Sequence, residues 1–69
     1  MINSQKLKER MRDLGITQEQ AAESLGIKQP TFSQKCIGSR SFKVQEIHAL
    51  IHLLQIEDHD VIDFFFAER

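Results

Sequence analysis

Three groups of residues in this sequence carry side chains that could coordinate a metal or take part in catalysis. His48 and His52 are four residues apart, so on a helix both imidazoles would lie on one face. Residues 58–60 place two aspartates around a histidine, and Cys36 is the one thiol of the chain. The histidine pair has no glutamate or third ligand beside it, as a zinc site needs, so we expect surface or boundary histidines, no metal and no cofactor. We expect an aspartate of 58–60 to cap a helix, and Cys36 to pack in the core rather than act as a nucleophile.

The length of the chain also argues against an enzyme. Its 69 residues are enough for one domain, and a domain of this size buries only about 60% of its unfolded surface. There is no run of 18 apolar residues and no apolar segment typical of a signal peptide near the N-terminus. With a single cysteine, we expect a single cytoplasmic domain over residues 1–69 with no catalytic residues.

The charges are strongly separated along the chain. Nine Lys and Arg against ten Asp and Glu give a net charge of −1, which by itself argues against a polyanionic partner. Residues 1–43, however, sum to +4 and residues 44–69 to −5, and the 22 residues 24–45 hold four bases and no acid. Such an asymmetry indicates a surface that faces a polyanion, with chance clustering in a short chain as the alternative.

Apolar spacing and helix-terminating residues predict an all-α fold of five short helices without a strand. The first helix, 4–14, has apolar residues at i, i+4 and i+7 and ends at Gly15. The second begins at Thr17, which forms a capping-box pattern with Gln20, and it ends near Gly26.

The last three helices follow from the same signals. The third begins near residue 28 or 29 with Pro30 in its first turn, where the missing N–H does no harm, and Gly38 closes it. Phe32 and Cys36 then face inward. The fourth, about 43–55, buries an apolar stripe formed by Val44, Ile47, Leu50, Ile51 and Leu54. A short fifth helix covers 61–66.

The second and third helices are joined by only three residues, 25–27, one of them glycine. A connection this short predicts two helices at a steep angle, a helix-turn-helix over about residues 17–37. The sequence here resembles the helix-turn-helix domains of phage repressors and Cro proteins, the lambda-repressor-like family. Five residues within TQEQAAESLGIKQPTFSQ carry the resemblance: Gln18, Ala22, Gly26, Ile27 and Phe32. The segment SQKCIGSRSF, an amphipathic helix and a terminal Phe cluster are similar to a subgroup of small phage regulators from Gram-positive hosts.

This resemblance implies that the third helix enters the major groove of operator DNA, as in a transcriptional repressor of a phage or mobile element. The residues it places against base edges are Lys28, Gln29, Thr31, Ser33 and Gln34. Those it places against phosphates are Gln18, Lys35, Arg40 and Lys43. Lys35 stands where the family usually has an apolar residue, and we expect Cys36 to take over that packing role.

The C-terminal Phe cluster is too wide for one helix face, because successive helical residues point about 100° apart. Val61, Phe64 and Phe65 can share one face, which leaves Ile62 and Phe66 on another. Leu53 lies opposite the main stripe of its helix. Exposed apolar residues often mark an association site, so the candidates for a homodimer interface are Leu53, Ile62 and Phe66. The alternative is a last helix that wraps over the end of the domain and buries them.

A two-fold dimer would place two recognition helices about 34 Å apart, one turn of DNA. The second interpretation of the whole sequence is a protein-interaction module, antirepressor-like or antitoxin-like. In that case the acidic, Phe-rich C-terminal half binds a regulatory protein partner.

Overall fold

Local caps determine where the first two helices begin and end. The computed structural model describes residues 2–66. Helix α1 (Ser4–Leu14) begins at Asn3, whose side-chain oxygen accepts a hydrogen bond from the Lys6 amide at 3.1 Å, and ends at Gly15 with a φ of 70°. Helix α2 (Gln18–Leu25) follows Thr17, whose hydroxyl accepts from the Gln20 amide at 3.1 Å while the Gln20 side chain accepts from the Thr17 amide at 2.9 Å. The predicted capping box is confirmed.

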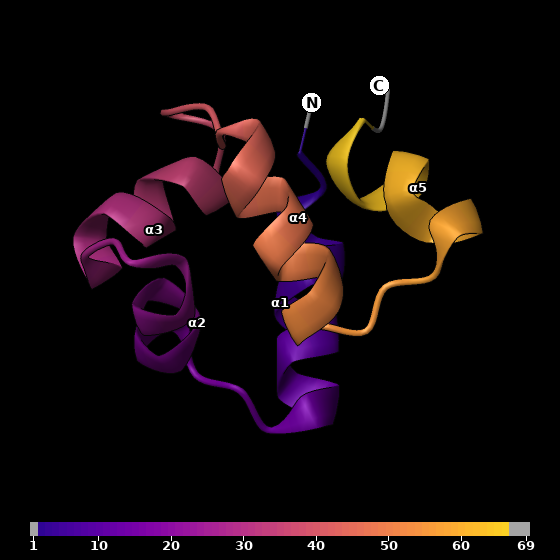
Figure 1. The fold of residues 1–69 in the computed structure, drawn as a ribbon, viewed down its shortest axis with the longest axis horizontal. Helices are drawn as coiled ribbons and strands as arrows, with labels where there is room; N and C mark the ends of the chain where they lie inside the picture. The colour runs from indigo at the N-terminus through magenta and orange to yellow at the C-terminus, as the bar shows by residue number, and fades with distance from the viewer. Residues whose placement is uncertain (1, 67–69) are drawn as a thin grey trace.

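The remaining elements are α3 (Gln29–Cys36), α4 (Val44–Leu53), the 3-10 turn η1 (Asp58–Asp60) and α5 (Val61–Phe65). Within residues 2–66 the chain therefore forms five α-helices and no strand (Figure 1). The predicted all-α, five-helix fold is confirmed.

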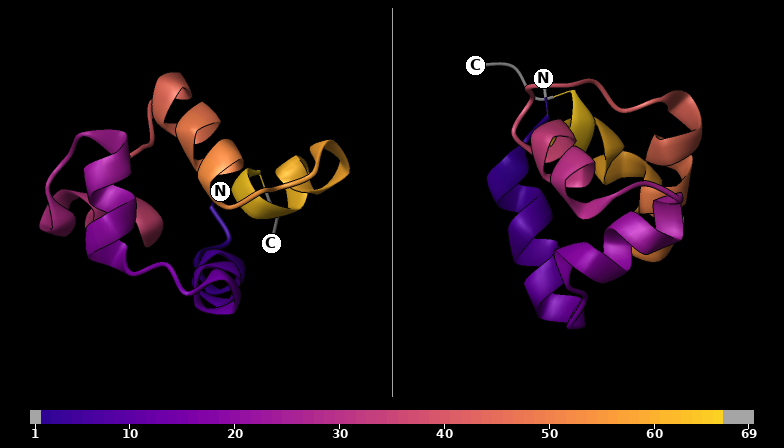
Figure 2. Two further views of the ribbon diagram at one scale, coloured as in Figure 1. Left: turned by 60° about the horizontal axis from the view of Figure 1, so that its bottom comes forward. Right: turned by 90° about the vertical axis from the view of Figure 1, so that its left-hand side faces the viewer.

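The five helices are arranged so that α2 and α3 lie at one end of the molecule and α5 at the other, with α1 and α4 between them (Figures 1 and 2). Helix α2 packs against both α3 and α4, and α1 packs against α5. Residues 18–36, which include α2 and α3, hold two acids and two bases, whereas η1 and α5 hold three aspartates and no Lys or Arg. The end of the fold with α5 is therefore the more acidic one.

The core lies between these helices and draws on all of them. Leu7, Phe32, Leu50 and Leu54 are completely buried, and the small side chains of α2 let its neighbours approach closely. The other buried members are Met11, Ala21, Ala22, Cys36, Ile56, Phe64 and Phe65. The inward placement predicted for Phe32 and Cys36 is confirmed.

Helix α4 is shorter than predicted, and its first apolar residue is not buried. Val44 begins the helix with 71% of its surface exposed, because the buried stripe starts one turn later. The helix ends at Leu53 rather than near residue 55, since Gln55 has a φ of 53° and leaves the helical conformation. Leu54 follows the helix and is still fully buried.

The last helix lacks the aspartate cap that the sequence suggested. Neither Asp58 nor Asp60 forms a side-chain capping hydrogen bond in this part of the structure. Asp60 already has helical backbone angles, with φ −99° and ψ −8°, so it cannot take the extended form of a capping residue. The η1 turn, closed by the Asp60 amide on the Glu57 carbonyl at 2.8 Å, leads directly into α5.

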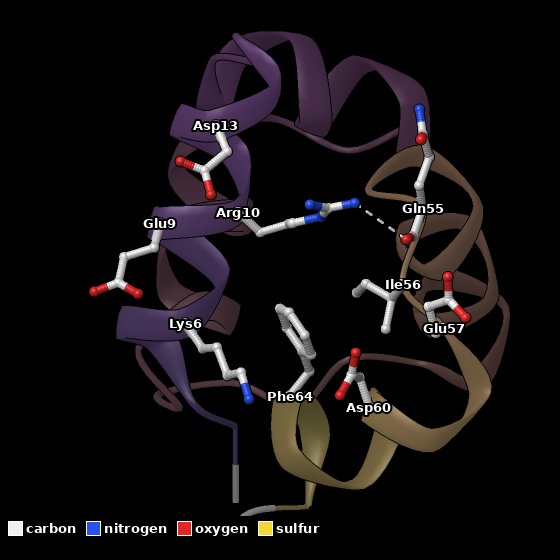
Figure 3. Close-up of a pocket in the computed structure, with 9 residues that line it drawn as sticks. All are labelled: Lys6, Glu9, Arg10, Asp13, Gln55, Ile56, Glu57, Asp60 and Phe64. Carbon is white, nitrogen blue, oxygen red and sulfur yellow. Dashed lines mark hydrogen bonds between the residues drawn. The ribbon is translucent and has the colours of Figure 1, made fainter.

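Arg10 connects α1 to the turn that follows α4. Its Nε donates to the Leu54 carbonyl at 2.8 Å. Its Nη2 donates to the Gln55 carbonyl at 3.3 Å (Figure 3), which supports the left-handed backbone conformation of Gln55. Beside Arg10 is an open hollow of about 420 Å³ between α1 and the C-terminal segment. Just before α1, the Asn3 amide donates to the Phe64 carbonyl of α5 at 2.9 Å. These contacts hold α5 against α1, away from α2 and α3.

Candidate nucleic-acid interface

The turn between α2 and α3 forms as the sequence predicted. Gly26 has a φ of 75°, a conformation that favours glycine, and ends α2. The Ile27 amide donates to the Ala22 carbonyl at 3.0 Å, which closes the turn. Ala22 and Phe32 are buried and α2 packs against α3, so one face of α3 is turned inward and the other outward.

That outward face of α3 is polar. Gln29, Pro30 and Gln34 are exposed, Thr31 and Ser33 are half-buried, and Lys28 is exposed just before the helix. The opposite face holds Phe32, Cys36 and Lys35. The five residues that the resemblance placed against base edges thus lie together along α3 and its first turn.

Gln18 at the start of α2 is tied to the middle of α3. The Ser33 hydroxyl donates to the Gln18 side-chain carbonyl at 2.6 Å. This bond occupies the acceptor of the Gln18 amide and leaves its NH₂ group to donate. Gln18 is the first residue of α2, and the first backbone amides of a helix have no partner within the helix.

Lys35 is not available as a phosphate contact in this structure, which corrects the expectation from the sequence. Only 6% of the residue is exposed, and its ammonium binds both carboxylate oxygens of Glu46 at 2.7 and 2.8 Å. Lys35 is held inward because the neighbouring first turn of α4 supplies a buried carboxylate, that of Glu46. Glu46 was not predicted as a functional residue, although its position three residues after Lys43 fits a helix start.

The Glu46 carboxylate is held in its charged form. Burial alone would raise its pKa, but the hydrogen bonds from the Lys35 ammonium and the Lys43 amide outweigh burial. Together with the charges of both lysines, they keep the pKa of Glu46 below its ordinary value.

The loop 37–43 lies beside the end of α3 and carries two exposed bases, Arg40 and Lys43. The Gln34 carbonyl accepts from the amides of Ser39 and Arg40 at 2.9 and 3.3 Å, which ties the loop to α3. On its inner side the Phe42 ring stands edge-on to Phe32, with 6.0 Å between ring centroids. The loop is therefore anchored at several points while its bases face solvent.

The residues with metal-binding or catalytic side chains do not converge. His48 and His52 are exposed along α4, whereas Cys36 is buried in the core. Burial raises the pKa of the Cys36 thiol to about 11 and outweighs the positive charge of Lys8, which lowers it. Among residues 2–66, no three His, Cys, Asp or Glu side chains are grouped so that they could hold a metal ion.

The three proposed dimer residues differ in exposure. Ile62 and Phe66 are 68% and 54% exposed. Leu53 is half-buried and packs against the core, so the monomer itself accounts for much of its apolar surface. Sequence reasoning missed Ile37, which is 64% exposed and lines an open groove of about 420 Å³ that also includes Phe66. Its place directly after the buried Cys36 was the available signal.

Comparison with protein families matches residues 4–64 to a helix-turn-helix domain. The match spans all five helices except Phe65, the last residue of α5. No curated protein matches the sequence significantly. Within the part of the chain that the structure describes, no helix is long and apolar enough to cross a membrane. The chain belongs to the helix-turn-helix domain family, whose fold suggests that it binds DNA.

Proposed function

We propose that this protein is a sequence-specific transcriptional regulator, a repressor of the phage or mobile-element type, that reads operator DNA with α3 in the major groove. The observation that carries the proposal is the outward face of α3. It gathers Gln29, Thr31, Ser33 and Gln34 on an eight-residue helix. Glutamine side chains can pair with adenine through two hydrogen bonds, and Lys28 can donate to guanine.

The residues around α3 fit contacts to the DNA backbone. Gln18, with its carbonyl accepting from Ser33, has an amide NH₂ to offer a phosphate at the start of α2. Arg40 and Lys43 are exposed on the loop at the other side of α3. Lys35, neutralised by Glu46, is not part of this set. Contacts of this kind would supply most of the affinity and make it fall with salt.

A homodimer through α5 is compatible with the dimensions of the domain. Two recognition helices about 34 Å apart would each lie roughly 17 Å from a two-fold axis. The domain measures 27 by 24 by 20 Å, and α5 lies at the end opposite to α2 and α3 (Figure 1). Ile62 and Phe66 are the exposed apolar residues of the C-terminal segment, and Phe66 also lines a groove with Arg40 of the loop 37–43. In such a dimer the acidic η1 and α5 would face away from DNA.

Titration of fluorescent duplexes at low and at raised salt tests the proposal. A preferred duplex is first selected from a random pool, and a scrambled duplex of equal length is the control. We expect tighter binding to the selected duplex, with an affinity for both that falls steeply as salt rises. If neither duplex bound at low salt, the proposal would fail. The remaining candidate would then be a protein-interaction module, for which the exposed Ile62 and Phe66 near acidic residues provide a surface.

A further inference from the structure

The ion pair between Lys35 and Glu46 is the most buried polar contact near α3. The Lys35 ammonium binds both oxygens of the Glu46 carboxylate, and the two side chains are only 8% and 9% exposed. One of these oxygens also accepts from the Lys43 amide at 2.8 Å. The carboxylate thus accepts three hydrogen bonds, two from the Lys35 ammonium and one from the Lys43 amide. Their directions restrict how Lys35 and the first turn of α4 can lie relative to each other.

The two partners come from the two ends of the loop 37–43. Lys35 is in the last turn of α3, directly after Gln34, and Glu46 is in the first turn of α4. Helices α3 and α4 each pack mainly against α2 rather than against each other. The ion pair is therefore a direct connection between the DNA-reading helix and the helix that follows it.

Stability alone does not explain a buried ion pair at this place. Apolar residues of similar volume often replace such a pair with no loss of stability, because removing two charges from water is unfavourable. An apolar contact, however, has no preferred direction. The particular property of Lys35 and Glu46 is the orientation that their hydrogen bonds impose on α3 and on the loop.

We propose that Lys35 and Glu46 are positioning residues that determine the sequence specificity of α3 without touching DNA. The inference rests on the proposed function above. Hydrogen bonds to base edges form only over a narrow range of distances, about 2.7 to 3.2 Å. A small rotation of α3 would therefore break them, whereas the attraction between Arg40 or Lys43 and phosphates varies slowly with distance. Loss of the ion pair lowers discrimination between sequences more than it lowers general affinity.

The double variant Lys35→Met/Glu46→Leu tests this inference, because it replaces the pair with apolar side chains and leaves no buried charge. We expect a urea midpoint equal to or above that of the unmodified protein. The ratio of affinities for selected and scrambled duplexes should fall about tenfold, the equivalent of one base contact. The salt dependence of binding should stay the same, since Lys35 neutralises no phosphate. Lys43→Met is the matched control: its amide still bonds to Glu46, but the salt slope should decrease by about one.

Two results would overturn the inference. One is a folded double variant that discriminates as well as the unmodified protein, and the other is a salt slope reduced by about one, which would make Lys35 a phosphate contact. If the first variant does not fold, Lys35→Met/Glu46→Gln keeps an acceptor for the Lys43 amide and is judged by the same ratio. Failure of the proposed function is distinguishable, because the unmodified protein itself would then show no discrimination, and the inference would fall with it.

Discussion

The Ser33 hydroxyl of α3 donates a hydrogen bond to the side-chain carbonyl of Gln18 at the start of α2, with 2.6 Å between the oxygens. The bond joins the two helices of the helix-turn-helix on the surface where we propose that DNA binds. It also fixes the orientation of the Gln18 amide, so that the NH₂ group remains to donate. A base-reading candidate and a phosphate-contact candidate are thus coupled before any DNA is present.

The hydrogen bond between Ser33 and Gln18 should make a measurable contribution to the stability of the fold. Combining Ser33→Ala with Gln18→Ala in a double-mutant cycle should give a coupling free energy of about 0.5–1.5 kcal/mol in urea unfolding, the usual net contribution of a hydrogen bond. Thr31→Ala combined with Gln18→Ala is the control and should be additive. Additive effects of Ser33 and Gln18 would show that the bond does not persist in solution.

Loss of a base contact and loss of a phosphate contact should have different effects on DNA binding. Gln29→Ala removes an exposed side chain from the first turn of α3, and we expect roughly tenfold less discrimination between selected and scrambled duplexes. Arg40→Ala should weaken binding to all duplexes to a similar extent and reduce the salt slope by about one. Equal effects of the two changes on both duplexes would contradict the assignment of base reading to α3.

Acid should destabilise the fold through Glu46. Its pKa in the folded protein is held below the ordinary value by Lys35 and Lys43, despite burial. The unfolded chain therefore takes up this proton first as the pH falls. The stabilisation is complete above the unfolded pKa, about 4.3, and is lost as the pH falls through the lower folded pKa. Urea midpoints measured from neutral to acid pH should decrease less steeply in Glu46→Gln, and parallel curves would argue against this role.

Cys36 should react slowly while the protein is folded. Burial raises the pKa of its thiol to about 11, and 2% of the residue is exposed, so the thiolate that reacts is scarce and shielded. Alkylation by iodoacetamide near pH 8, followed by mass spectrometry, should be far slower in native buffer than in denaturing urea. Since Cys36 is the one cysteine of the chain, the adduct needs no site assignment. Equal rates in the two solvents would mean that α3 opens readily.

The proposed dimer interface can be tested with exposed and half-buried residues. Ile62→Ser and Phe66→Ser change exposed side chains and should lower the mass measured by sedimentation, with a urea midpoint that no longer depends on protein concentration. Leu53→Ala should leave the mass unchanged and cost about 1–2 kcal/mol of stability, because Leu53 packs against the core. An unchanged monomer mass in all three proteins would exclude association through α5.

Helix boundaries were predictable because the interactions that define them are local. Thr17 and Gln20 are three residues apart, and Gly15 and Gly26 need only their own backbone conformation to end a helix. The polar character of the outer face of α3 likewise follows from residue order. The capping of α5 was predicted wrongly, since an aspartate before a helix caps it only if its backbone is extended, and Asp60 is already helical.

The roles of Lys35 and Leu53 could not be predicted in this way. Composition and spacing describe Lys35 as a base on a helix, but Glu46, eleven residues later, neutralises and buries it. Leu53 lies off the apolar stripe of its own helix and was therefore predicted to be exposed, yet it packs partly buried against the core. The sequence by itself determined the order of the helices, the ends of α1 and α2 and the separation of charge along the chain. Only the tertiary structure decided which bases and apolar side chains remain exposed, because burial depends on partners that distant segments bring together.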